Sequence, residues 1–259
     1  MVHYGIQEIL CAIFCFLAVF STNSLAQEPA AVAAAPAIRI QPPGFQSTPL
    51  NPPRPPFEEI HPPVIEKVSP GIFRIGDILI NKKERSISFP AEVNMGRGLL
   101  EYLVVRMGGK THESLLRTTV EPYPLQVAFL LLGYEGTDQP LSRQGAPETP
   151  KGEPVKITVT HNGVDGKVET IDYEQWICKK IDGTTCEVPA LTWVYSGSVV
   201  AEGRFPAQQE GSLIALYHDP VALIDNSSSG GESDKIWFVK EDAVPPAGTA
   251  VTVTIRPKL

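Results

Sequence analysis

The segment GGKTHESLL, residues 108–116, gathers the side chains from which many active sites are built. Its candidate site residues are Lys110, His112, Glu113 and Ser114. Serine and histidine are typical of nucleophilic catalysis when a carboxylate orients the imidazole. Lysine beside histidine is typical of a site that binds a carboxylate or phosphate. The segment therefore raises two hypotheses, a catalytic site and a binding site.

The elements around the segment decide which side chains can meet. We expect GGK to be a turn and residues 111–120 to form the return strand of a hairpin. Successive side chains of a strand point to opposite faces, so Lys110, His112 and Ser114 would share one face and Glu113 would point to the other. An acid that orients His112 must then come from another segment. Three carboxylates are candidates: Glu92, Glu101 and Asp219.

Two functions remain open at this point. The first is a non-enzymatic binding or scaffold domain whose ligand, a protein or a small anionic molecule, contacts residues 110–114. The alternative is a hydrolase-type enzyme with His112 as the base and Ser114 or a water molecule as the nucleophile. No GxSxG motif surrounds Ser114, and Leu116 stands where an HExxH zinc motif needs its second histidine. A solvated outer strand face without any function also fits the pattern.

The remaining histidines and cysteines carry weaker signals. In YHDP, residues 217–220, His218 and Asp219 follow an apolar strand, which is typical of a turn and less often of a site. A metal bound by His112 and His218 is a weak hypothesis, and we predict no resident metal or cofactor. Cys178 and Cys186 lie close together in the sequence, so we predict a disulfide between them in an oxidising compartment.

The N-terminal region indicates export. Residues 9–20 are an unbroken apolar run, too short to span a bilayer comfortably, and Ser24-Leu25-Ala26 offers small residues for a cut before Gln27. We therefore predict a signal peptide at 1–26 and a periplasmic or extracellular location. Contact with a membrane is expected only if that segment stays uncleaved. Residues 27–66 are rich in proline and alanine and are predicted to be a disordered, semi-rigid linker.

Charge narrows the class of partner. The formal net charge is −7, and no basic run is interleaved with aromatic residues. Nucleic-acid binding depends on clustered lysine and arginine opposite the phosphates, so nucleic acid is excluded as an expected partner.

The domain predicted at 67–259 has α+β character dominated by β-structure, with mostly antiparallel sheets. Residues 86–94 alternate cleanly, with Ile87, Phe89, Ala91 and Val93 on one face. Pro90 places that strand at an edge or a bulge. A buried helix is expected at about 123–133. A short helix is expected at about 173–180, because Asp172 with Gln175 three residues on forms a capping-box pattern. The domain could divide into lobes at 67–135 and 153–259.

Several blocks resemble a known family. FPAEVN, LEYLVV, GKTHESLL and LLLG in the first half, with WVYSGS, GSLIALYHDP and AGTAVTVTIRP in the second, resemble the YdjY-type domain of exported bacterial proteins. The resemblance covers residues 71–259. It implies a role for Lys110, His112, Glu113 and Ser114 but no particular activity.

Overall fold

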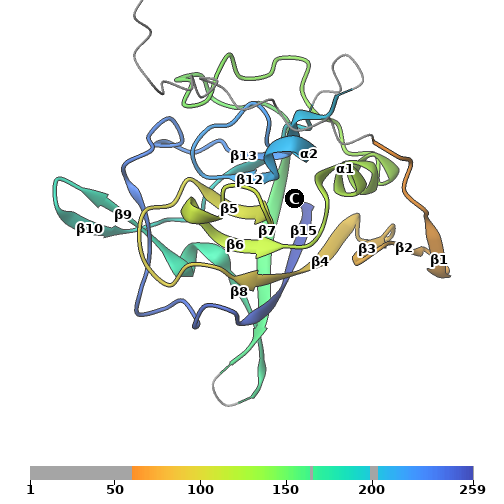
Figure 1. Cartoon of the computed structure of the whole chain (residues 1–259), viewed down its shortest axis with the longest axis horizontal. Helices are drawn as coiled ribbons and strands as arrows, with labels where there is room; N and C mark the ends of the chain where they lie inside the picture. The colour runs from red at the N-terminus through yellow and green to blue at the C-terminus, as the bar shows by residue number, and fades with distance from the viewer. Residues whose placement is uncertain (1–59, 164–165, 199–203, 259) are drawn as a thin grey trace, which may run out of the picture. The chain divides into compact units, whose positions relative to one another are not determined.

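The computed structural model describes residues 60–163, 166–198 and 204–258 (Figure 1). The predicted signal peptide and residues 27–59 of the predicted linker lie outside this range. The described residues belong to one compact unit. The first strand, β1, begins at Glu66, one residue before the predicted start of the domain.

The described residues are mainly β-structure, which confirms the predicted fold class. The strands are β1 (Glu66–Ser69), β2 (Ile72–Ile75), β3 (Ile78–Asn81), β4 (Ser86–Val93), β5 (Tyr102–Arg106), β6 (Ser114–Thr118), β7 (Glu153–Asn162), β8 (Val168–Asp172), β9 (Ile177–Ile181), β10 (Thr184–Glu187), β11 (Trp193–Tyr195), β12 (Ser212–Ala215), β13 (Ile224–Asn226), β14 (Trp237–Val239) and β15 (Ala250–Pro257). The helices are α1 (Pro122–Leu131), α2 (Pro206–Glu210) and the short 3₁₀ helices η1 (Thr111–Glu113) and η2 (Tyr173–Trp176).

A closed ring of strands forms a barrel. The order is β4-β15-β7-β11-β13-β12-β5-β6, and β6 pairs with β4 to complete the ring. The strands β1 to β3 extend the sheet outward from β4 (Figure 1). The strand β8 pairs with β7, and a second sheet has the order β10-β9-β14. The last strand, β15, joins the two halves of the sequence because it lies between β4 and β7.

The alternating strand expected at 86–94 is β4. Its apolar face is buried, with Ile87, Phe89 and Val93 almost inaccessible to solvent. Pro90 lies where one neighbour of β4 changes: β3 pairs with β4 up to Ser88, and β6 pairs with it from Glu92 onward. Proline has no N–H to donate, so the gap between these two partners accommodates it. Its carbonyl accepts a hydrogen bond from Thr118 at 2.6 Å.

The hairpin predicted around GGK is wrong. The strands β5 and β6 are parallel neighbours, with Tyr102 opposite Ser114 and Arg106 opposite Thr118. Residues 107–113 carry the chain back to the start of β5, and η1 occupies part of this return. On its other side β6 pairs antiparallel with β4, and this pairing closes the barrel.

The longer predicted helix is confirmed, but one side of it is exposed to solvent, although the whole helix was expected to be buried. Residues 122–131 form α1, prolines lie in its first turn, and Gly133 follows it with φ of +71°. Phe129 is buried as expected, but Leu130 and Leu131 are 58% and 41% exposed. No helix among the described residues has the length and apolar character needed to cross a membrane.

The short helix predicted at 173–180 is only the four-residue η2. Residues 177–181 instead form β9, because they pair with β10 and β14 on either side. The Asp172 side chain does not cap η2; it forms an ion pair with Lys156 at 2.9 Å. Tertiary pairing therefore overrides the local capping pattern.

The predicted disulfide is also absent, because Cys178 and Cys186 are free thiols. The register of β9 and β10 places Cys178 opposite Glu187 and Cys186 opposite Lys179. The two cysteines are thus offset by one position, and their side chains point to opposite faces: Cys178 is buried and Cys186 is exposed.

Candidate functional site

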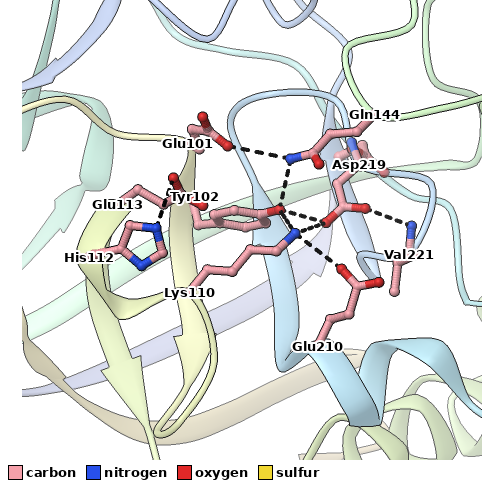
Figure 2. Close-up of polar contacts among 10 residues, drawn as sticks. Glu101, Tyr102, Lys110, His112, Glu113, Gln144, Glu210, Asp219 and Val221 are labelled. Carbon is pink, nitrogen blue, oxygen red and sulfur yellow. Dashed lines mark hydrogen bonds and ion pairs between the residues drawn. The ribbon is translucent and has the colours of Figure 1, made fainter. Parts of the chain in front are cut away.

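A polar network joins the end of the GGK turn to the segment that follows β12 (Figure 2). The Tyr102 hydroxyl donates a hydrogen bond to Oδ2 of Asp219 at 2.7 Å and accepts one from Nζ of Lys110 at 2.6 Å. Nζ of Lys110 also lies 3.6 Å from Oδ2 of Asp219 and 3.1 Å from Oε2 of Glu210. Gln144 adds a weaker hydrogen bond to the phenol at 3.2 Å. We call Lys110, Tyr102, Asp219 and Glu210 the lysine network.

The lysine network lies against the barrel wall and outside the main core. Tyr102 belongs to a separate small buried cluster with Val105, Ala215 and Ala222. The two positions between Tyr102 and Val105 in β5, Leu103 and Val104, belong to the main core instead. The chain after β12 covers Tyr102 and brings Asp219 onto its hydroxyl.

The surroundings of Lys110 and Tyr102 determine the charge on these two side chains. Burial lowers the pKa of Lys110, but the Asp219 and Glu210 carboxylates outweigh it, and the pKa is raised overall. Burial, followed by the Asp219 carboxylate, raises the pKa of Tyr102 far above its ordinary range. At neutral pH the lysine is therefore an ammonium ion and the tyrosine is a neutral phenol. Neither is poised to act as a base.

Asp219 is held from several directions. Its Oδ1 accepts the backbone N–H of Val221 at 2.9 Å, and its own N–H donates to Oδ1 of Asp225 at 2.9 Å. Burial raises the pKa of Asp225 well above its ordinary value, and repulsion from the Asp219 carboxylate adds to this shift.

Ser114 is not available as a nucleophile. The residue is fully buried, and its hydroxyl donates to the carbonyl oxygen of Leu116 at 2.7 Å. Its own carbonyl accepts a hydrogen bond from the Asn94 side chain at 2.7 Å. Ser114 therefore helps to fix the start of β6.

The face expected to unite Lys110, His112 and Ser114 does not form. The 3₁₀ turn η1 points Lys110 toward Tyr102, whereas the side chain of His112 is 78% exposed (Figure 2). Glu113, the residue predicted to point away, lies closest to the imidazole, with its Oε2 3.5 Å from Nε2 of His112. A helical turn brings neighbouring side chains to one side where a strand would separate them.

Glu101 borders the same edge. Its backbone N–H donates to the carbonyl oxygen of Glu113 at 2.8 Å, and Gln144 donates to its carboxylate at 3.4 Å. Burial, with repulsion from Glu113 and Asp234, raises the pKa of Glu101 to about 6. We call Glu101, His112 and Glu113 the acidic edge.

A known protein family matches most of the chain, including the residues of the lysine network and the acidic edge. A profile of the YdjY domain matches residues 78–256 of the 259 residues in the chain. The chain belongs to the YdjY domain family. The matched range contains both the lysine network and the acidic edge. Comparisons of this YdjY domain with curated proteins and with solved structures gave no significant match.

The other predicted partners of His112 lie elsewhere in the YdjY domain. Glu92 forms an ion pair with Arg117 at 2.6 Å. His218 is buried, and its two ring nitrogens lie 2.7 Å and 3.0 Å from the carbonyl oxygens of Ala146 and Asn226. Within the described residues, no group of three or more histidine, cysteine, aspartate or glutamate side chains could hold a metal ion. The structure thus gives no support to the metal site considered for His112 and His218.

Sequence reasoning missed Tyr102, Gln144 and Glu210. Tyr102 had a usable signal, because a tyrosine inside an apolar strand needs a partner for its hydroxyl. Gln144 and Glu210 had none, since each reaches the network from an unrelated segment: a loop and the end of α2.

Proposed function

We propose that this YdjY domain is an exported, non-enzymatic binding module whose protein partner contacts the acidic edge. The observation that carries the proposal is the contrast between a fixed interior and an exposed rim. Lys110 and Tyr102 both contact Asp219, and the Ser114 hydroxyl donates to the backbone carbonyl of Leu116. What remains accessible at the edge is the imidazole of His112, which is 78% exposed and lies beside the partly buried carboxylates of Glu101 and Glu113.

The charge of this edge favours a particular kind of partner. Lys110 was expected to attract an anion, but its ammonium group already contacts the carboxylates of Asp219 and Glu210. Glu101 and Glu113 repel each other, and this repulsion contributes to the raised pKa of Glu101. A partner that presents lysine, arginine or N–H donors would relieve the repulsion.

Export is the second part of the proposal. It rests on the apolar run at 9–20, the small residues before Gln27 and the proline-rich stretch that follows. A spacer of this kind would hold the domain away from a membrane or wall. Recovery of the protein with Gln27 as its first residue from the periplasm or the medium would support it; recovery of uncleaved protein in the cytoplasm would contradict it.

Site-specific photocrosslinking tests the binding edge. A photoreactive amino acid at His112 in the full chain should give a discrete crosslinked product in cells that express the protein. The double variant Glu101→Gln/Glu113→Gln should reduce that product several-fold. A matched probe at the exposed Glu84 should not give it. Identical products from both positions would refute the edge as a binding surface.

A hydrolase remains the second candidate because of the His112–Glu113 contact. A carboxylate 3.5 Å from an exposed imidazole is the arrangement expected of a base that activates water. Ser114 is excluded as the nucleophile by its burial. Turnover of ester or phosphoester substrates that disappears in His112→Gln would establish this alternative and overturn the non-enzymatic proposal.

A further inference from the structure

A second concave site lies away from the acidic edge, beside the hairpin of β7 and β8 and the second sheet. It is a cleft of about 490 Å³, within the range of about 300–1,000 Å³ typical of small-molecule sites. Its walls come from β7, β8, η2, the end of β10 with the following loop, and the segment after β14. The lining residues are His161, Glu169, Ile171, Asp172, Glu174, Gln175, Trp176, Glu187, Val188, Ala190, Lys240 and Ala243.

Two carboxylates in the cleft keep their charge uncompensated. Asp172 is paired with Lys156 at 2.9 Å, and Glu187 is paired with Lys240 at 2.8 Å. Glu169 and Glu174 form no ion pair with a lysine or arginine of the described residues. Oε2 of Glu169 lies 3.7 Å from Nε2 of the His161 imidazole.

Glu174 is the more informative of the two. Its Oε1 accepts the backbone N–H of Leu191 at 2.9 Å, a bond that fixes the carboxylate in place. Burial raises its pKa above the ordinary value, which shows that the surroundings disfavour the negative charge. A cation in the cleft would provide the missing compensation.

The rest of the wall is apolar and aromatic. The indole ring of Trp176 packs against the imidazole of His161 with their centroids 5.1 Å apart, and both side chains are largely buried. Ile171, Val188 and Ala190 add aliphatic surface next to these rings. Such a wall suits a hydrocarbon chain or a planar group that can stack.

We propose that this cleft binds an organic cation, an amine or guanidinium group on a short aliphatic chain. The charged group lies between Glu174 and Glu169, and the chain lies against Trp176 and Ile171. The same chemistry is available from a free small molecule and from an arginine side chain of another protein. This site is independent of the acidic edge, which shares no residue with it.

Titration of the full chain with matched probes tests the proposal. The first probe is n-butylguanidinium and the second is n-butylurea, which has nearly the same shape and no charge. The readout is the indole ¹⁵N–¹H NMR signal of Trp176, assigned with Trp176→Phe. We expect saturable shifts with the guanidinium at millimolar concentrations and at least tenfold weaker binding of the urea. Equal affinity for the two probes, or no saturation with either, would overturn the proposal.

Two variants then test whether the cation binds beside Glu174. Glu174→Gln keeps the shape and the acceptor for Leu191 and should weaken guanidinium binding about tenfold, whereas Glu66→Gln on the exposed β1 should not change it. An unchanged affinity in folded Glu174→Gln would place the cation elsewhere and refute the assignment. Tighter binding of the peptide acetyl-Gly-Arg-Gly-amide than of n-butylguanidinium would identify a protein side chain as the source; the reverse would identify a free ligand.

Discussion

The ion pair inside the lysine network gives the most direct test of the structure. Lys110→Met removes the ammonium but keeps most of the aliphatic side chain. It leaves the Asp219 carboxylate, of which only 3% is exposed, with the Tyr102 hydroxyl and the Val221 N–H as its remaining partners. A buried charge that loses its partner destabilises the folded state strongly.

The structure sets the size of the effect. Two charges 3.6 Å apart attract each other by about 4–5 kcal/mol at an effective dielectric constant of about 20. Part of this is offset because methionine avoids the desolvation of the ammonium, and the Lys110 side chain is 25% exposed. We therefore expect Lys110→Met to lower the free energy of unfolding by about 2 kcal/mol at neutral pH.

A double-mutant cycle separates the pair from other effects. Urea unfolding of the parent protein, Lys110→Met, Asp219→Asn and the double variant should give a coupling energy of at least about 1 kcal/mol. Lys67→Met on the exposed β1 is the control and should change stability by less than about 0.5 kcal/mol. Additive effects of the two network variants would refute a direct charge interaction between Lys110 and Asp219.

Three further predictions concern other parts of the structure. Maleimide should label Cys186 in the native protein and Cys178 only after unfolding. If neither cysteine reacts without reductant, even after unfolding, the result would instead support a disulfide between them. The pKa of Glu101 is raised from 4.5 to about 6, so the folded state binds the extra proton and the free energy of unfolding should fall as pH rises from about 4.5 to about 6. Solvent screening limits this fall to about 1 kcal/mol, and it should vanish in Glu101→Gln; a profile unchanged by the substitution would show that another group titrates. Gly231→Ala should destabilise the protein by about 2–3 kcal/mol in thermal or urea unfolding, because the added Cβ would lie 2.2 Å from Nε2 of His218. Gly96→Ala, which meets no atom within 4 Å, is the matched control, and equal stability of the two variants would contradict the packing around His218.

Local patterns predicted those elements whose own residues decide their state. The alternation in β4 fixes which face is buried, and the prolines and Gly133 set the ends of α1. The predictions for η2 and for the two cysteines failed because both depend on how β9 pairs with β10 and β14. A capping pattern or a short spacing between cysteines contains no information about that register.

The same division holds for the candidate site. The sequence by itself determined the membership of the YdjY family, the β-rich class and the chemical content of residues 110–114, because these follow from residue types in order along the chain. Tertiary structure alone decided which of those groups meet. The parallel pairing of β5 and β6 turns Lys110 inward and buries Ser114. Asp219 reaches Tyr102 across 117 positions because the chain after β12 folds over β5, a contact set by packing in three dimensions and not by any local spacing.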